Sequence, residues 1–165
     1  NNPKPIIAEV SGIATAAGCQ LVASCDLAIA SDESMFATPG VNIGLFCSTP
    51  MVALSRNVTN KHAMEMLLTG DMIDAKKATE IGLINNNVSS ENLVQETLKL
   101  AKKVSSKSSM TLKIGKQAFY AQSSLDLSEA YKYTSQVMLD NILKDDAKEG
   151  IEAFINKRDP KWKDK

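Results

Sequence analysis

The 165-residue sequence has no excess of either charge, since nineteen lysines and arginines balance nineteen aspartates and glutamates. Proteins that bind nucleic acid usually carry a basic excess gathered on one face, so we expect no nucleic-acid partner. Long apolar runs are missing too. Stretches such as Pro5–Ala8 and Met64–Leu68 are far shorter than the roughly 20 residues that cross a bilayer, and we therefore expect no membrane span.

Cysteine is scarce and shows no paired spacing. The three cysteines, Cys19, Cys25 and Cys47, are odd in number and form no CxxC pair. This pattern predicts neither a disulfide framework nor a metal site, and it favours a reducing compartment. The sequence also opens without a charged-then-apolar leader: Asn1–Pro5 runs straight into a strand-like segment. We expect this start to be the middle of a domain, with any targeting segment upstream.

A hydrophobic share of 44% and a charged share of 23% are ordinary for a globular domain. The β-branched segment Pro5–Val10 is typical of a buried strand that ends at Gly12, Asp26–Ala30 predicts a second strand, and Met35–Thr38 a short third one. A small-residue turn and a short helix separate the first two strands. This order predicts a βαβ unit with a right-handed crossover.

After Gly44 the pattern is mainly helical, with one short strand expected at Leu83-Ile84. Asp74 is a good N-cap, and Gly70 and Gly82 stand where helices would stop. The expected helices cover residues 60–68, 75–81, 110–121, 128–143 and 146–157, and Ser89 or Ser90 is expected to cap a further one that reaches Val104. The helix over residues 60–68 places Ala63, Met64, Leu67 and Leu68 on one side, and the helix after Ser90 places Leu93, Val94, Leu98, Ala101 and Val104 on one face. The sequence therefore predicts an α/β fold, with a core over residues 1–107 and a helical C-terminal region over residues 108–165.

The segment from Ile13 to Gly18 is the most informative for chemistry. After Ile13 it contains no side chain larger than threonine, so its backbone can approach a ligand closely. If a helix begins near Ala17, its free N–H groups and its dipole point at whatever binds there. Such a donor would stabilise a thioester enolate oxygen more than the ground-state carbonyl. Composition alone, however, favours the plainer interpretation that small residues let a helix pack tightly on a sheet.

The surrounding residues resemble a known family. Lys4–Leu21 closely resembles the KPxIAxVxGxAxGGGxEL motif of the crotonase (enoyl-CoA hydratase/isomerase) superfamily. Cys25–Ala30 and Phe36–Pro39 are similar to that family's CDxxxA and FxxPE segments in order and spacing. Its helical landmarks resemble Met64–Gly70, Ala75–Leu83 and Glu149–Phe154. The resemblance covers nearly the whole chain.

By this resemblance the fold would be the C-terminal part of a crotonase-type spiral of ββα units, followed by a helical trimerisation region. The ligand would be acyl-CoA, with no other cofactor, and the protein would form a homotrimer or hexamer in the mitochondrial matrix and act in fatty-acid metabolism. The backbone N–H of Ala17 would be one of two oxyanion donors, the other lying upstream of Asn1. The resemblance assigns substrate contacts to Ala14, Thr15, Ala16, Gly18, Pro39, Gly40, Ile43 and Lys157.

The sequence departs from the family at the catalytic carboxylates. The two glutamates with which the family's hydratases handle water and proton are replaced by Gln20 and Gly40, and a later carboxylate of some relatives aligns with Ser48. Glutamine cannot exchange a proton near neutral pH, and glycine has no side chain with which to do so. We therefore expect an acyl-CoA-binding protein that is hydratase/isomerase-like but lacks both hydratase glutamates. The alternative is a non-catalytic acyl-CoA-binding paralogue with a regulatory or structural role.

The remaining candidates have plainer interpretations. By the resemblance, Lys157 meets CoA phosphates, often those of a neighbouring subunit, although a charged tail is usually just solvated. Met138 matches, more weakly, a family aromatic beside the adenine. His62 has no recognisable partner and is expected to be structural. Asp26, Asp32 and Glu33 are expected to be a strand-start cap and residues of a solvated turn. Cys47 and Ser48 are expected to form a small polar wall of the pocket.

Overall fold

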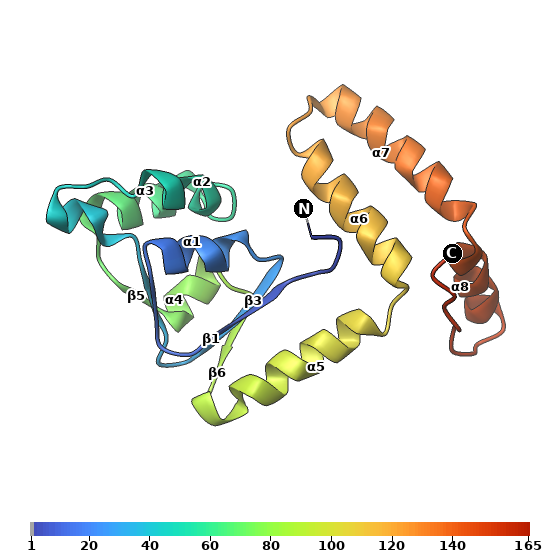
Figure 1. Cartoon of the computed structure of the whole chain (residues 1–165), viewed down its shortest axis with the longest axis horizontal. Coiled ribbons are helices and arrows are strands. Elements are labelled where there is room, and N and C mark those ends of the chain that lie inside the picture. The colour runs from blue at the N-terminus through green and yellow to red at the C-terminus, as the bar shows by residue number, and fades with distance from the viewer. Residues whose placement is uncertain (1) are drawn as a thin grey trace. The chain divides into compact units, whose positions relative to one another are not determined.

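The computed structural model describes residues 2–165, which divide into two compact units (Figure 1). One unit is Ile6–Ala101, and the other is Lys102–Lys165 together with the segment before Ile6. The strands are β1 (Ile7–Val10), β2 (Ile13–Thr15), β3 (Leu27–Ser31), β4 (Met35–Ala37), β5 (Ile73–Asp74) and β6 (Asn86–Val88). The helices of the first unit are α1 (Ala17–Ser24), η1 (Pro39–Ile43), α2 (Ser48–Leu54), α3 (Asn60–Thr69), α4 (Ala75–Glu80) and η2 (Ser90–Asn92).

The strands of the first unit form two small sheets, in the orders β1-β3-β6 and β2-β4-β5. In the first sheet β1 pairs with β3 in parallel, Ile7 lying opposite Leu27, and α1 connects the two strands. This arrangement confirms the βαβ unit that the sequence predicts. The α/β fold class is confirmed with it.

The second sheet contains a strand that the sequence did not reveal. Gly12 was expected to end the first strand and lead into a turn, but its backbone at φ +96° redirects the chain into β2. β2 pairs in parallel with β4, Ala14 lying opposite Phe36. From β1 to β4 the strands therefore alternate between the two sheets, and β1, β2 and α1 together make a ββα unit.

Two helix ends agree with the capping signals in the sequence. Gly70 ends α3 with φ +68°, a left-handed conformation that glycine adopts without a steric penalty. Asp74 caps α4 by accepting a 2.7 Å hydrogen bond from the N–H of Lys77. The predicted strand at Leu83-Ile84 is wrong: both residues are buried side chains of the core, and the strand follows at β6.

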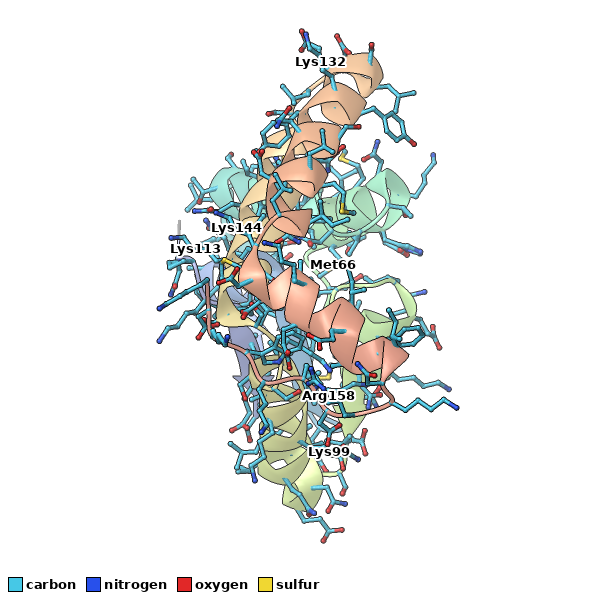
Figure 2. The ribbon with its side chains drawn as sticks, turned by 90° about the vertical axis from the view of Figure 1, so that its right-hand side faces the viewer. Met66, Lys99, Lys113, Lys132, Lys144 and Arg158 are labelled. Carbon is cyan, nitrogen blue, oxygen red and sulfur yellow. The ribbon has the colours of Figure 1, made fainter. Side chains whose placement is uncertain are left out.

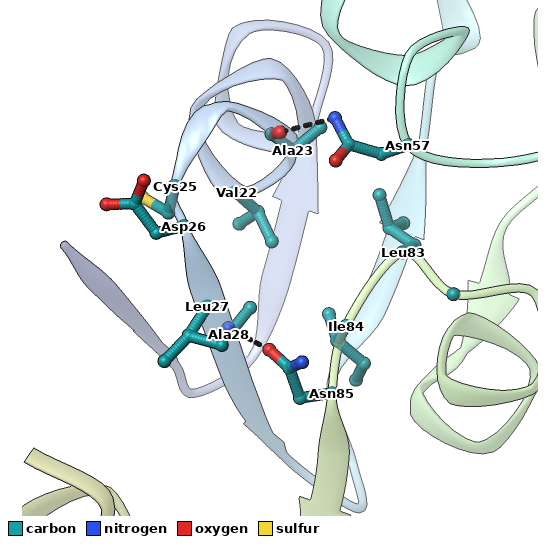
Figure 3. A pocket seen from close by; sticks show the side chains of 11 residues that line it. Val22, Ala23, Cys25, Asp26, Leu27, Ala28, Asn57, Leu83, Ile84 and Asn85 are labelled. Atoms are coloured by element: carbon teal, nitrogen blue, oxygen red, sulfur yellow. Dashed lines mark hydrogen bonds between the residues drawn. The ribbon is translucent and has the colours of Figure 1, made fainter. Parts of the chain in front are cut away.

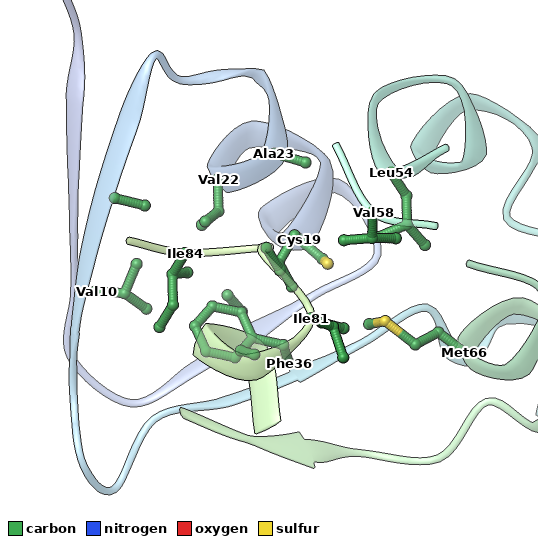
Figure 4. Close-up of a cluster of buried hydrophobic side chains, with 14 of the residues drawn as sticks. Val10, Cys19, Val22, Ala23, Phe36, Leu54, Val58, Met66, Ile81 and Ile84 are labelled. Atoms are coloured by element: carbon green, nitrogen blue, oxygen red, sulfur yellow. The ribbon is translucent and has the colours of Figure 1, made fainter. Parts of the chain in front are cut away.

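The core of the first unit forms between α1, α2, α3 and the two sheets. Phe36, Leu54 and Leu67 are its largest fully buried apolar residues, and Figure 4 shows Phe36 facing Cys19 across the cluster. The expected apolar face of α3 needs a correction. Met64 is 45% and Leu68 59% exposed, whereas Met66, which the sequence pattern had not placed on that face, is buried with Ala63 and Leu67.

Helix α5 (Leu93–Ser105) runs from the first unit into the second. Leu93 and Thr97 are its buried residues, while Val94 and Leu98, predicted to be on the apolar face, are 57% and 52% exposed. Of the residues predicted for that face, Leu93 is buried and Ala101 and Val104 are half-buried, so the prediction is wrong only for Val94 and Leu98.

The second unit is helical, as predicted. It contains α6 (Ser109–Gln122), α7 (Leu127–Ile142) and α8 (Asp145–Ile155), and α7 packs against both of the others. Ser108 and Asp126 cap α6 and α7 through their side-chain oxygens. No residue of α7 is buried. Within residues 2–165, no helix combines the length and the apolar character that crossing a membrane requires.

Candidate functional site: the turn before the first helix

The turn between β2 and α1 is held by backbone hydrogen bonds on both of its sides. The N–H of Ala16 donates to the carbonyl of Ala37 at 3.0 Å, and the carbonyl of Ala16 accepts from the N–H of Gln20 at 2.9 Å. Ala16 itself has φ 48° and ψ −112°, a conformation that residues with a Cβ rarely adopt. The turn is therefore fixed in a strained form at the residue that directly precedes the helix.

Helix α1 begins at Ala17, which meets the condition under which the sequence analysis expects a helix N-terminus to face a ligand at this turn. Ala17 is exposed, and its N–H finds no acceptor among residues 2–165. It is one of the N–H groups that a helix leaves unpaired in its first turn, and the first turn of α1 contains no acidic side chain to meet it. A donor in this position, at the positive end of the helix dipole, can stabilise negative charge on an oxygen.

Gln20 lies one turn along α1 from Ala17, so the two residues share a face of the helix. Its side chain is half-buried, and its amide makes no hydrogen bond with any other described residue. The neutral amide can donate to an oxygen or accept from a water, but it cannot take up a proton at neutral pH.

Gly40 stands in η1, where the chain has no room for a side chain. Its carbonyl accepts from the N–H of Leu45 at 2.9 Å, and its own N–H points to the sulfur of Cys47 at 3.3 Å. A Cβ at residue 40 would lie 2.8 Å from the carbonyl oxygen of Leu45 and 3.0 Å from the Cys47 sulfur. Any residue with a Cβ at this position, a carboxylate-bearing one included, would therefore require the backbone of the loop to shift.

Cys19 and Cys47 are buried in the same cluster as Ala14 and Ala16. Burial raises the pKa of the Cys19 thiol to about 11, and the neighbouring Cys47 thiol adds to the shift. Cys19 is therefore protonated at neutral pH and is a poor nucleophile. Ser48, at the third carboxylate position, is exposed, and its hydroxyl donates to the carbonyl of Phe46 at 3.3 Å.

Thr38 is a candidate that the sequence did not single out. It follows Ala37, the acceptor of the turn, and precedes Pro39. Its hydroxyl is fully buried and has no partner among the described residues. Buried polar groups are nearly always hydrogen-bonded, so an unpartnered hydroxyl beside this turn is notable. The only sequence signal is a hydroxyl residue between an apolar strand and a proline.

The other residues predicted to contact the substrate differ in their solvent exposure. Ala14 is buried at 7% exposure, Thr15, Gly18 and Pro39 are half-buried, and Ile43 is 76% exposed. Lys157 and Met138 belong to the second unit. Within the first unit, the structure brings together Ala14 to Gln20 and the loop after Ala37.

The remaining polar candidates have ordinary structural partners. Asp26 accepts a 2.7 Å hydrogen bond from the N–H of Ile6, consistent with a role at the start of a strand. Asp32 and Glu33 accept hydrogen bonds from side chains of the segment that follows α4. His62 lies 3.7 Å from Glu65 one turn further along α3, a partner that the sequence analysis had not recognised.

A small cavity of about 130 Å³ opens at the opposite end of α1 from Ala17 (Figure 3). Asn57 and Asn85 line it, and each already bonds to backbone: the Asn57 amide donates to the carbonyl of Ala23, and Asn85 accepts from the N–H of Ala28. These amides tie neighbouring segments to α1 and β3. The cavity is thus separate from the turn.

The closure of the loop at Gly40 is testable by substitution. Gly40→Ala should lower the free energy of unfolding by about 1–3 kcal/mol, because the added Cβ forces the backbone of Leu45 to move. Gly18→Ala is the matched control, since a Cβ there meets only the Ala14 side chain at 3.9 Å, and it should not destabilise. Denaturant unfolding of the full-length variants measures both. A Gly40→Ala variant as stable as Gly18→Ala would show that the loop is not closed in this way.

The sequence of the chain is similar to those of known proteins over nearly its whole length. The sequence profile of the enoyl-CoA hydratase/isomerase family matches residues 1–165. The chain is 58% identical over 162 residues to enoyl-CoA hydratase domain-containing protein 3, mitochondrial, of Mus musculus, and 54% identical to the protein of that name from Homo sapiens. Each match covers 98% of this chain and 54% of the relative, so the chain spans about half the length of these relatives.

Solved structures of similar proteins match the chain in fold as well as in sequence. The crystal structure of human enoyl coenzyme A hydratase domain-containing protein 3 is 55% identical with a TM-score of 0.94, covering 98% of this chain and 64% of that one. An enoyl-CoA hydratase from Mycobacterium smegmatis is 48% identical with a TM-score of 0.95, covering 97% of this chain and 62% of that one. The chain therefore belongs to the enoyl-CoA hydratase/isomerase family and has the crotonase fold of its members.

Proposed function

We propose that this chain is the part of an acyl-CoA-binding, enoyl-CoA hydratase-like protein that polarises the thioester carbonyl but lacks the carboxylates for hydration. The observation that carries the proposal is that Ala17, an exposed residue at the start of α1, has an N–H without an acceptor among the described residues. Its strained, doubly anchored neighbour Ala16 supports it, because strain of this kind persists only where the surroundings maintain it.

The contacts to the ligand would come from the turn and the loop after Ala37. Alanine at residue 17 does not remove the donor, since the donor is backbone. The small side chains around it leave the N–H accessible to a thioester oxygen. The residues that we propose for substrate contact in the first unit are Ala14, Thr15, Ala16, Gly18, Pro39, Gly40 and Ile43.

Hydration needs a group that exchanges a proton with the attacking water. Gln20 has a neutral amide, Gly40 sits where no side chain fits, and Ser48 donates to a backbone carbonyl. If the protein is an enzyme, its base comes from the substrate or from a residue that the family motifs do not identify. The alternative, a non-catalytic acyl-CoA-binding paralogue, is favoured by the closed loop at Gly40, because that loop leaves no space for a second acid.

The relatives also bear on location. The mouse and human relatives carry the word mitochondrial in their names. We extend the proposal to the mitochondrial matrix and to fatty-acid metabolism, where acyl-CoA thioesters are handled. No further cofactor is proposed.

The proposal is tested by separating binding from chemistry in the full-length protein. Titration calorimetry should detect binding of a medium-chain acyl-CoA, while hydration of the matching enoyl-CoA, followed by loss of its conjugated absorbance, should be negligible. Each missing acid–base group typically costs about 10²–10⁴ in rate. Gln20→Glu should raise hydration measurably, with Gln20→Ala as the control that alters the same position without adding a carboxylate.

Rapid hydration by the unmodified protein would contradict the loss of the carboxylates as the explanation. Gly40→Glu is a poor companion variant, because the Leu45 carbonyl lies where its Cβ would be. Failure of the unmodified protein to bind any acyl-CoA would reject the proposal as a whole.

We propose further that the full-length protein assembles as a homotrimer or hexamer through its C-terminal helices. The support is the apolar surface of the second unit, where Leu127, Tyr131 and Leu143 of the α7 region and Phe154 of α8 are 69–83% exposed. Sedimentation velocity at micromolar concentration should give a species of three or six chains. A monomer under those conditions would contradict the assembly.

A further inference from the structure

The solvent side of α5 carries two apolar residues that the helix does not bury. Val94 and Leu98 are 57% and 52% exposed and lie one turn apart in the same row of side chains. A single exposed leucine is ordinary on a protein surface, since apolar atoms make up much of any such surface. The pair becomes informative through the residues that lie beside it.

Three exposed lysines flank this pair on the same helix. Lys102 continues the row one turn after Leu98, and Lys99 and Lys103 form the row next to it. Lys99, labelled in Figure 2, lies 3.2 Å from the carboxylate of Glu96. Lys102 and Lys103 make no ion pair or side-chain hydrogen bond with any residue in the described part of the chain. Because these residues share one continuous helix, their spacing follows from helix geometry alone.

The lysines of α5 belong to a basic segment that the neutral total charge conceals. From Thr97 to Leu125 the sequence contains no aspartate or glutamate. The same stretch contains six lysines, which are Lys99, Lys102, Lys103, Lys107, Lys113 and Lys116. Residues 6–101 have ten acidic and five basic residues, whereas residues 102–165 have nine acidic and thirteen basic ones. An anionic partner would therefore be attracted to this segment even though the chain as a whole is neutral.

Simpler interpretations explain only part of this surface. Lys102 and Lys103 lie in the last turn of α5, where the helix dipole favours a cation. The dipole does not account for Lys99 in the preceding turn or for the exposed apolar pair. A nucleic acid would engage the lysines through its phosphates and leave Val94 and Leu98 without a role. An anionic bilayer surface engages both, because its headgroups attract ammonium groups and its interfacial region accepts apolar side chains.

We propose that the solvent side of α5, formed by Val94, Leu98, Lys99, Lys102 and Lys103, docks on an anionic phospholipid surface. The helix would lie in the plane of the headgroups, with its apolar pair dipping among them. The long lysine stems would lie along the apolar side chains while their ammonium groups reach lipid phosphates. The docking surface uses none of the residues proposed for acyl-CoA binding, so either proposal can fail without the other.

The electrostatic half is tested by sedimenting the full-length protein with lipid vesicles. It should bind vesicles of phosphatidylcholine mixed with phosphatidylglycerol far better than vesicles of phosphatidylcholine alone. Binding should weaken as the ionic strength rises, because salt screens exposed charges. Replacing Lys102 and Lys103 with glutamine should weaken binding about fivefold for each lysine, and replacing them with arginine should retain it. Lys61→Gln with Lys76→Gln is the matched control, since it removes two exposed lysines elsewhere and should change binding little.

The apolar half is tested on Leu98. Leu98→Gln should weaken vesicle binding severalfold, because the polar side chain loses the interfacial contact. Leu68→Gln on α3 is the matched control, since Leu68 is 59% exposed and lies away from the lysines of α5, and it should leave vesicle binding unchanged. Both variants should keep the free energy of unfolding and the acyl-CoA affinity of the unmodified protein.

Several results would overturn the inference. They are equal binding to both kinds of vesicle, full binding by the glutamine variant of Lys102 and Lys103, and an equal loss in the Lys61 and Lys76 control. A Leu98→Gln protein that unfolds more easily than Leu68→Gln would also overturn it, because another part of the protein or a second copy would then cover α5. Binding of a single-stranded RNA but of neither vesicle would assign the lysines to a different partner and reject the lipid surface. In all of these cases, acyl-CoA binding would leave the proposed function standing.

Discussion

The hydrogen bond from the N–H of Ala16 to the carbonyl of Ala37 is the contact on which the candidate site depends. It continues the parallel pairing of β2 with β4 by one residue and fixes the point at which the strand turns into α1. Ala16 is held there at φ 48°, outside the helical conformation, and the helix starts at the next residue, Ala17, which is exposed. Without this bond Ala16 could relax, and the direction of the Ala17 N–H would no longer be set.

Strand β4, which ends at Ala37, also leads into the loop in which the family's second glutamate is replaced by Gly40. Three residues after Ala37, the chain closes on itself through Gly40, Leu45 and Cys47. The exclusion of a side chain at residue 40 is thus a property of the loop as a whole, because two of its nearest neighbours are backbone atoms of other residues. A turn that presents an N–H donor beside a loop that admits no acid is consistent with a protein that binds a thioester without hydrating it.

Local signals in the sequence predicted some of this structure well. The cap of α4 by Asp74 and the end of α3 at Gly70 both follow from residues that lie within a turn of the feature. The strand β2 could not be predicted in this way, because Gly12 ends one strand and opens the next, and only the pairing with β4 distinguishes the two. The buried face of α3 likewise depends on which side the core covers, so Met66 was missed.

The candidate site, too, could be predicted from the sequence only in part. The small residues and the replacements at Gln20 and Gly40 are visible in the sequence, whereas the strain at Ala16, the closure at Gly40 and the buried hydroxyl of Thr38 are not. Each of these depends on contacts between residues that are not adjacent in sequence or on a backbone angle that no residue type dictates. An alanine in a glycine-like conformation gives no compositional signal at all.

The most direct test of the account is the carbonyl stretching vibration of an acyl-CoA labelled with ¹³C at the thioester and bound to the full-length protein. The measurement compares the natural peptide bond before residue 17 with an ester, which removes the Ala17 N–H and leaves the side chain unchanged. The account predicts that binding to the natural protein shifts the band to lower wavenumber, because the donor polarises the carbonyl, and that the ester loses part of this shift. Identical band positions for the two proteins would contradict a role for the Ala17 N–H.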